Sequence, residues 1–188
     1  MLEHRQPFDS LLEEGGNTLI EKPGVRVTWR SGSGFLLLQT RSGSVLQGAL
    51  TSHIGLPLAA PQESSARGGR ALLWLTPREW LLELPANETA SVRTELTGHL
   101  ATSLAAVIDM SDGYVTCDVS GACAADVLMS GCTLDLRADA FHTGRSARTA
   151  LADIPAIIWK PGREPLCFRC IVDRSFARHL RDWLVDAA

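Results

Sequence analysis

The sequence predicts an α+β fold made of two similar halves. Short apolar runs with period-2 alternation, the pattern of strands with one buried face, recur along the chain and are separated by helical runs. The predicted order of elements is strand-helix-strand-strand-helix-strand over residues 25–110, and a similar order follows over residues 111–188. We therefore expect two ferredoxin-like βαββαβ halves that share a single compact domain, residues 25–188.

The first 24 residues differ from the rest of the chain. Residues 1–24 lack sustained periodicity and end in Lys22-Pro23-Gly24, a turn signal, so we expect an N-terminal arm that is either mobile or ordered by a partner. After this arm, residues 25–30 alternate as a strand, and residues 35–40 form a second apolar run. The Ser-Gly-Ser-Gly segment between the two runs predicts that they pair as a β-hairpin.

Helix and loop signals follow this predicted hairpin. Leu46, Leu50 and Ile54 recur at four-residue spacing and predict a short helix that ends near Gly55. Residues 57–70 are rich in Pro, Ser and Gly and are predicted to form a loop.

The end of the first half is predicted as two strands, a helix and a third strand. Residues 71–75 and 80–84 are apolar strand candidates, joined by a turn at Thr76-Pro77-Arg78-Glu79 that carries a capping-box signature. Asn87 is the predicted N-cap of the helix, and residues 104–110 are the last strand. The apolar face of this helix consists of Val92, Leu96 and Leu100.

The second half carries its own strand and helix signals. Residues 115–119 alternate as a strand, Ser120 is the predicted N-cap of a helix, and Asp173 is the predicted N-cap of the final helix. A turn is predicted at residues 161–165. Three further strands are predicted at residues 146–151, 156–160 and 166–172. The apolar faces of the two helices consist of Ala124, Val127, Leu128 and Gly131, and of Phe176, Leu180, Trp183 and Leu184.

Composition and charge exclude several classes of protein. The 18 Lys and Arg residues are outnumbered by 21 Asp and Glu residues, and the charges are scattered, so we expect neither a nucleic-acid-binding nor a membrane-binding surface. No apolar run approaches the roughly 18 residues of a membrane span. The acidic N-terminus resembles neither a signal nor a transit peptide, and the five cysteines form an odd set, so we expect a cytoplasmic protein with reduced thiols.

Cysteine-based chemistry is the first candidate for a site. Cys167 and Cys170 fit a C-x-x-C pattern, which suits a redox pair or half of a zinc site, but on a strand these positions point to opposite faces. Cys123 is expected near a helix start, where backbone amides stabilise a thiolate. No histidine stands at a spacing that nominates a base for it, so packing is the favoured role of all three cysteines.

A carboxylate in a turn is the second candidate. Asp112, in Ser111-Asp112-Gly113, could bind an amine or a ring nitrogen of a ligand, but Asp and Gly also suit a tight turn between strands. The glycine-rich segments at residues 31–34 and 67–70 match neither of the nucleotide-binding glycine patterns. We therefore predict no catalytic residue, no metal ligand and no cofactor-binding residue.

Four segments resemble one known family, the gamma subunit of heterotetrameric sarcosine oxidase, which is related to the aminomethyltransferase (T-protein) fold of the glycine cleavage system. The order and the spacing of the four segments also match the family pattern. The segments are LWLTPREWLLELP (73–85), VIDMSDGYVTCDVSGACAADVLMSGCTLDL (107–136), AFHTGRSART (140–149) and FRCIVDRSFARHLRDWL (168–184).

The resemblance implies a non-catalytic subunit of an oxidoreductase complex. In such oxidases the alpha and beta subunits carry the flavins, the NAD and the sarcosine site, and the delta subunit holds zinc. The gamma subunit packs on the alpha subunit and binds no redox cofactor. The complex oxidatively demethylates sarcosine to glycine, with tetrahydrofolate as the one-carbon acceptor. The alternative that the same fold relationship implies is a stand-alone tetrahydrofolate-binding or aminomethyltransferase-like protein of one-carbon metabolism, for which Asp112 is the candidate folate contact.

Overall fold

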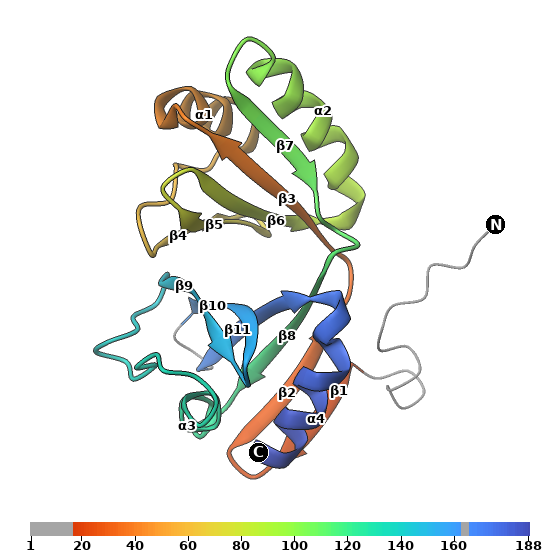
Figure 1. Cartoon of the computed structure of the whole chain (residues 1–188), viewed down its shortest axis with the longest axis vertical. Coiled ribbons are helices and arrows are strands. Elements are labelled where there is room, and N and C mark those ends of the chain that lie inside the picture. The colour runs from red at the N-terminus through yellow and green to blue at the C-terminus, as the bar shows by residue number, and fades with distance from the viewer. Residues whose placement is uncertain (1–16, 163–165) are drawn as a thin grey trace, which may run out of the picture. The chain divides into compact units, whose positions relative to one another are not determined.

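The structure of the chain is a computed structural model that describes residues 17–162 and 166–188. The described residues form two compact units (Figure 1). Unit 1 combines the N-terminal segment up to Ser31 with Gly113–Thr143 and Arg148–Ala188, and unit 2 consists of Gly32–Asp112 and Gly144–Ala147. Each unit contains one β-sheet whose neighbouring strands run antiparallel.

Unit 2 is built on a five-stranded sheet in the order β4-β5-β6-β3-β7. Helices α1 and α2 cover the same face of this sheet (Figure 1). The strands are β3 (Ser33–Thr40), β4 (Ser64–Arg67), β5 (Arg70–Thr76), β6 (Glu79–Pro85) and β7 (Ala105–Asp109). The helices are α1 (Gly43–Ala49), the π-helical turn η1 (Leu50–Ile54), the 3-10 turn η2 (Ala86–Glu88) and α2 (Thr89–Leu100).

The core of unit 2 lies between this sheet face and the helices. The predicted face of α2 is confirmed, because Val92, Leu96 and Leu100 are all buried against the strands. Leu36 and Leu38 of β3 are fully buried in the same cluster. Because each buried leucine side chain contributes about 1.5–3 kcal/mol, this cluster provides most of the cohesion between the sheet and its helices.

Unit 1 is built on a six-stranded sheet in the order β1-β2-β8-β11-β10-β9. Its centre is a row of fully buried side chains, in which Val119 lies opposite Val27 on one side and Phe168 on the other. The strands are β1 (Thr18–Lys22), β2 (Val25–Arg30), β8 (Tyr114–Ser120), β9 (Ser146–Leu151), β10 (Ile154–Gly162) and β11 (Cys167–Asp173). The helices are α3 (Ala124–Met129), the 3-10 turn η3 (Arg174–Phe176) and α4 (Ala177–Ala187).

The two sheets share one strand order, which confirms the predicted pair of ferredoxin-like halves. The order β7-β3-β6-β5 in unit 2 corresponds to β2-β8-β11-β10 in unit 1. In this correspondence β2 takes the position beside β8 that β7 takes beside β3. A strand from the N-terminal segment therefore completes the sheet that the C-terminal half of the chain begins.

The predicted hairpin between residues 25–30 and 35–40 is therefore wrong. Strand β2 pairs with β1 and β8, whereas β3 pairs with β6 and β7. The alternating pattern identifies both segments as strands, but it does not specify their partners. Those partners are set by long-range burial, which gives β2 a position beside β8 and β3 a position between β6 and β7 in the other sheet.

Several local predictions also differ from the structure. Strand β4 lies within the predicted loop at residues 57–70. The sequence did not predict this edge strand, because Ser-Ser-Ala-Arg has no apolar alternation. Asn87 lies within η2, and the N-cap residue of α2 is Glu88 instead. Ser120 ends β8 and its hydroxyl donates to the carbonyl of Arg26, so α3 begins later, at Ala124.

The predicted N-terminal arm and the predicted turn at residues 161–165 are described only in part. Residues 1–16 and 163–165 lie outside the described residues. Within the predicted arm, Thr18–Lys22 forms β1 and pairs with β2.

The close approach of Gly121 to Gly24 gives a prediction about stability. Gly121 has a φ of +110°, and a Cβ atom at this position would lie 2.4 Å from the carbonyl oxygen of Gly24. We expect Gly121→Ala to lower the free energy of unfolding by about 2 kcal/mol or more, measured by urea denaturation. Gly98→Ala is the matched control, because no atom beyond its chain neighbours and its own helix backbone lies within 4 Å of its Cβ position in α2. The control should raise stability by about 0.5–1 kcal/mol, and equal effects of the two variants would show that the contact imposes no constraint.

Asp173 gives a prediction about pH dependence. Its carboxylate accepts hydrogen bonds from the hydroxyl and the backbone amide of Ser175, at 2.6 and 2.8 Å, and these bonds lower its pKa. Asp173 therefore caps η3, the turn that leads into the final helix, whereas the N-cap residue of α4 itself is Phe176. We expect Asp173→Ala to cost about 1 kcal/mol at pH 7. Because the folded-state pKa is depressed, this contribution is present above the unfolded pKa of about 4 and is lost as the pH falls through the folded pKa.

The control for this prediction is Asp173→Asn, whose amide oxygen accepts the same hydrogen bonds but does not titrate. Urea denaturation at pH 7, 5 and 3 should show that the asparagine variant retains most of the stability at pH 7 and loses the pH-dependent part. An alanine variant whose deficit stays constant from pH 7 to pH 3 would contradict the assigned role of the carboxylate.

Candidate functional site

Asp112 lies in a turn between β7 and β8. The neighbouring Ser111 makes the internal contacts of this turn: its hydroxyl donates to Asp109 at 2.7 Å and accepts from the backbone amide of Phe35 at 3.0 Å. Gly113 accepts a hydrogen bond from the amide of Arg174 at 2.8 Å. The Asp112 side chain is exposed. The sequence signal at this position therefore corresponds to a turn that Ser111 holds in place.

The cysteines of the C-x-x-C pattern have different neighbours. Cys170 lies directly opposite Cys117 of β8, and both side chains are buried. The hydrogen bond with Cys117, together with burial, raises the pKa of the Cys170 thiol. Burial, together with the charge of Asp118, raises the pKa of Cys167 to about 11. Because a thiolate is the reactive form, neither residue of the pattern is activated as a nucleophile.

Cys123 is the exposed cysteine among the five. It precedes α3 as the N-cap residue, whereas the sequence pattern predicts a helix that already includes it. Its backbone amide donates to the carbonyl of Gly24 at 2.8 Å, so the residue joins α3 to the turn between β1 and β2.

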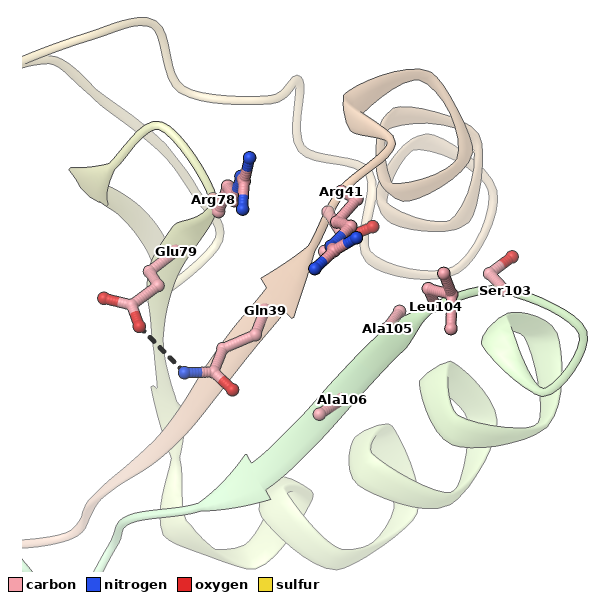
Figure 2. A pocket seen from close by; sticks show the side chains of 9 residues that line it. Gln39, Arg41, Arg78, Glu79, Ser103, Leu104, Ala105 and Ala106 are labelled. Carbon is pink, nitrogen blue, oxygen red and sulfur yellow. Dashed lines mark hydrogen bonds between the residues drawn. The ribbon is translucent and has the colours of Figure 1, made fainter.

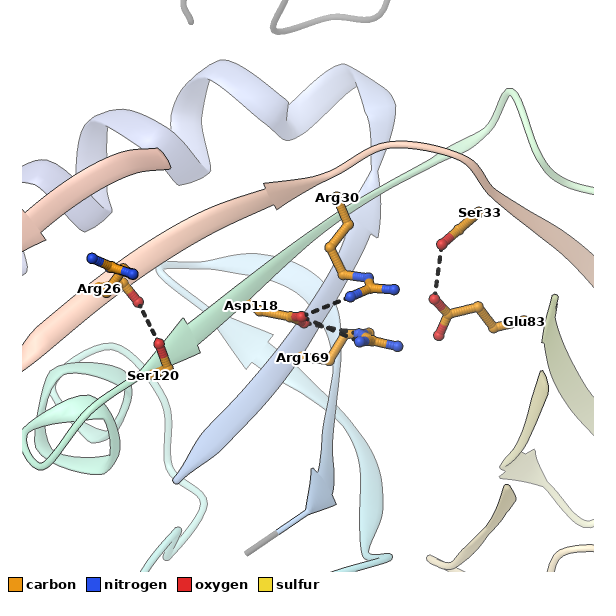
Figure 3. Close-up of polar contacts among 7 residues, drawn as sticks. All are labelled: Arg26, Arg30, Ser33, Glu83, Asp118, Ser120 and Arg169. Atoms are coloured by element: carbon orange, nitrogen blue, oxygen red, sulfur yellow. Dashed lines mark hydrogen bonds and ion pairs between the residues drawn. The ribbon is translucent and has the colours of Figure 1, made fainter. Parts of the chain in front are cut away.

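An ion cluster occupies the middle of the unit 1 sheet, and sequence reasoning did not identify it (Figure 3). Asp118 of β8 accepts hydrogen bonds from Arg169 of β11 at 2.8 and 3.2 Å, and from Arg30 of β2 at 3.1 Å. The side chains of Asp118 and Arg169 are 17% and 11% exposed, whereas Arg30 is 39% exposed. The guanidinium of Arg169 also lies 5.0 Å from the ring centroid of Trp159.

This cluster is a structural feature of the sheet. The carboxylate of Asp118 is bound on two sides by cations, and charge-assisted bonds of this kind contribute roughly 1.5–3 kcal/mol each when they are shielded from water. The only sign of the cluster in the sequence is a charged residue within each of three predicted strands: Arg30, Asp118 and Arg169. Which of these residues would meet could be known only after β2 had been placed beside β8.

Two other buried charged groups also have protein partners. The ammonium group of Lys160 in β10 donates to the carbonyl of Phe141 at 2.8 Å and lies 5.4 Å from the ring centroid of Phe168. In unit 2, Glu83 accepts a hydrogen bond from the hydroxyl of Ser33 at 2.9 Å (Figure 3). These groups satisfy the rule that buried charges are paired or hydrogen-bonded.

A pocket of about 600 Å³ lies at one corner of unit 2, where β3 ends and β7 begins (Figure 2). Arg41 and Arg78 stand at one end of the pocket, while the side chains of Gln39 and Glu79 are joined by a hydrogen bond of 2.8 Å at the other end. The exposed side chain of Leu104 lies beside it. Its lining residues are Gln39, Thr40, Arg41, Arg78, Glu79, Ser103, Leu104, Ala105 and Ala106.

Metal-ligating groups and membrane-spanning helices are not found in the described parts of the chain. Within residues 17–162 and 166–188, His, Cys, Asp and Glu side chains form no group of three or more that could hold a metal ion. None of the helices in these residues has the length and apolar character that crossing a bilayer requires.

The fold places the chain in a class of two-sheet α+β proteins that includes aminomethyltransferase T of the glycine cleavage system. The structure of that protein from Bartonella henselae matches 86% of this chain and 45% of the other chain, with a TM-score of 0.64. The identity is 17%, so this likeness concerns the fold.

Within this class, the chain belongs to the sarcosine oxidase, gamma subunit family, whose sequence model matches residues 41–188. Sarcosine oxidase subunit gamma from Corynebacterium sp. (strain U-96) is 34% identical over 139 residues, which make up 74% of this chain and 66% of that subunit. The same subunit from Arthrobacter sp is 33% identical over 77% of this chain and 70% of its own length. The aligned segment thus spans just under two thirds of the U-96 subunit.

A solved structure agrees with this assignment. The heterotetrameric sarcosine oxidase from Corynebacterium sp. U-96, in complex with pyrrole 2-carboxylate, contains a chain that matches 97% of this chain. The match covers 93% of that chain, with a TM-score of 0.86 and 30% identity. The predicted family and its aminomethyltransferase-like fold are confirmed.

The ion cluster gives a prediction that compares the contribution of its buried ion pair to stability with that of its more exposed ion pair. We expect Asp118→Asn to lower the free energy of unfolding by about 3 kcal/mol, because the buried guanidinium of Arg169 loses its carboxylate partner. Arg30→Met should cost about 1 kcal/mol or less, because this arginine is more exposed to solvent than Arg169. Urea denaturation of both variants measures the difference. Equal losses would show that Asp118 does not anchor the cluster.

Proposed function

We propose that this chain is the non-catalytic gamma subunit of a heterotetrameric sarcosine oxidase. In this proposal it packs on the large alpha subunit of a complex that oxidatively demethylates sarcosine to glycine, with tetrahydrofolate as the one-carbon acceptor. The observation that carries the proposal is the match along 97% of the chain to a subunit of a heterotetrameric sarcosine oxidase.

The chemistry of the described residues supports a non-catalytic role. The carboxylate of Asp118 forms ion pairs with two arginines. The pKa values of the Cys167 and Cys170 thiols are raised, which disfavours the thiolate form. A catalytic acid, base or nucleophile needs a pKa near the working pH and room for a substrate beside it. These groups are instead engaged in contacts that hold the sheet of unit 1 together.

The partners and the location of the chain are parts of the same proposal. The other subunits would be the alpha, beta and delta chains, and the flavins, NAD and zinc of the complex would reside on them. The complex would work in the cytoplasm. We also propose that residues 25–188 act as one compact domain made of two halves, about 25–110 and 111–188, preceded by an arm, residues 1–24, whose strand β1 joins the sheet of unit 1. The proposal assigns no cofactor to this chain.

Purification of the tagged chain from its native cells tests this function. We expect the chain to co-purify with large flavin-containing subunits and with sarcosine-oxidising activity, and to be colourless and inactive after it is separated from them. Because the fold alone also fits a folate protein, calorimetry with tetrahydrofolate on the isolated chain is the control. Recovery of the chain without flavoprotein subunits would contradict the proposal, as would heat from tetrahydrofolate that Asp112→Asn abolishes.

A further inference from the structure

The pocket at the corner of unit 2 carries two cations that the described residues leave unpaired. Arg41 follows β3 and Arg78 lies in the turn between β5 and β6, and both side chains are exposed. Neither guanidinium has an ion pair or a hydrogen bond to another described residue. The nearby carboxylate of Glu79 is engaged by Gln39 at the other end of the pocket. A carboxylate from outside is therefore the complementary group, because arginines bind carboxylates in a planar, bidentate geometry.

The same corner presents the edge of a sheet. Strand β7 is the last strand of the unit 2 sheet in the described part of the chain, with β3 as its neighbour. Hydrogen bonds from the amide of Arg41 to the carbonyl of Leu104 and from the amide of Met110 to the carbonyl of Phe35, at 3.4 and 2.8 Å, frame this pairing. The residues of β7 at odd positions therefore direct their backbone groups away from β3. An edge of this kind is a template for an added strand.

An apolar row accompanies this edge. Leu104, Ala106 and Ile108 alternate along the strand and share one face, and Ala106 lies opposite Gln39 on the pocket side of the sheet. Leu104 is 79% exposed and Ile108 is 40% exposed, which places both among the large apolar side chains most exposed in the described residues. A free carboxylic acid of small size would fill the arginine end of the pocket but would leave this row in water. A longer, extended ligand would cover both.

We propose that this corner is the docking site of an extended, acidic segment of a partner subunit. The segment would pair with the free edge of β7, place an Asp or Glu carboxylate between Arg41 and Arg78, and cover Leu104 with an apolar side chain. This inference rests on the proposed function, since it assumes that the chain works within a hetero-oligomer.

A second copy of this chain is a poorer occupant than a partner subunit. If two β7 strands paired antiparallel, the pocket face of one strand would meet the same face of the other, which carries Leu104, Ala106 and Ile108 and no carboxylate, whereas Asp109 lies on the opposite face. The carboxylate of Asp109 already accepts bonds from the amide and the hydroxyl of Ser111, at 3.0 and 2.7 Å. These bonds hold Asp109 in the turn that follows β7, so a carboxylate of another protein is the better partner for the two arginines.

The test measures how tightly variants of the full chain bind the remaining subunits of the complex. The test variant is Arg41→Gln with Arg78→Gln. The control is Arg67→Gln with Arg93→Gln, which removes the same charge from two exposed arginines outside the pocket. We expect the test variant to raise the dissociation constant about tenfold or more, because arginines at the centre of an interface often dominate its energy. The control should bind like the original chain.

Salt dependence provides a second readout. The affinity of the original chain should fall as sodium chloride is raised, because salt screens ion pairs near the protein surface. The affinity of the test variant should depend less steeply on sodium chloride, whereas the affinity of the control should depend on it as steeply as that of the original chain. Unchanged circular dichroism and thermal unfolding of the test variant would establish that it is folded, as expected for two exposed side chains.

A photo-crosslinking amino acid at position 104 identifies the occupant. We expect it to label an Asp- or Glu-containing peptide of a partner subunit within the assembled complex. Labelling of a second copy of this chain, or a test variant that binds like the control, would overturn the docking inference while the proposed function stands. If the original chain binds none of the flavoprotein subunits, both the proposed function and this inference are wrong.

Discussion

Strand β8, at the centre of the unit 1 sheet, holds that unit together through one carboxylate. Asp118 of β8 binds Arg30 of β2 on one side and Arg169 of β11 on the other, so a single side chain joins three strands that are far apart in sequence. The buried row that contains Val119 makes the same connection through apolar contacts. Together these contacts fix an N-terminal strand in a sheet that otherwise consists of the C-terminal half of the chain.

The same arrangement shows how the strands of unit 1 accommodate charged and thiol groups in buried positions. In strands buried on one or both faces, polar side chains are tolerated only when they are paired or hydrogen-bonded. Asp118, Lys160 and Cys170 each meet that requirement with a protein partner. Their polar groups are used to specify the pairing of strands, which agrees with the structural role that we propose for this chain.

Unit 2 carries the contrasting feature, because the two arginines of its corner pocket have no partner among the described residues. The unit has the same strand order as unit 1, yet β7 ends its sheet with an apolar row and two neighbouring arginines in solvent. A monomeric protein has no structural need for this combination, since exposed apolar rows beside a free edge favour association. The two related units therefore differ in where their arginines lie: in unit 1 Arg30 and Arg169 bind Asp118 within the sheet, and in unit 2 Arg41 and Arg78 face solvent.

Local patterns in the sequence were sufficient to identify most elements and their buried faces. Val92, Leu96 and Leu100 identified the buried face of α2, and Asp173 identified the cap before the final helix, because these signals depend on neighbours within a few residues. The order of four segments along the chain identified the family. The partners of the strands, in contrast, emerged only from the folded chain. In the folded chain residues 25–30 pair with β8 and not with residues 35–40. The fold also brings Asp118 next to Arg30 and Arg169, and it places Arg41, Arg78 and Leu104 around one pocket. Alternation states that a strand has a buried face, but which strand lies beside it is settled by the burial and pairing of the whole sheet.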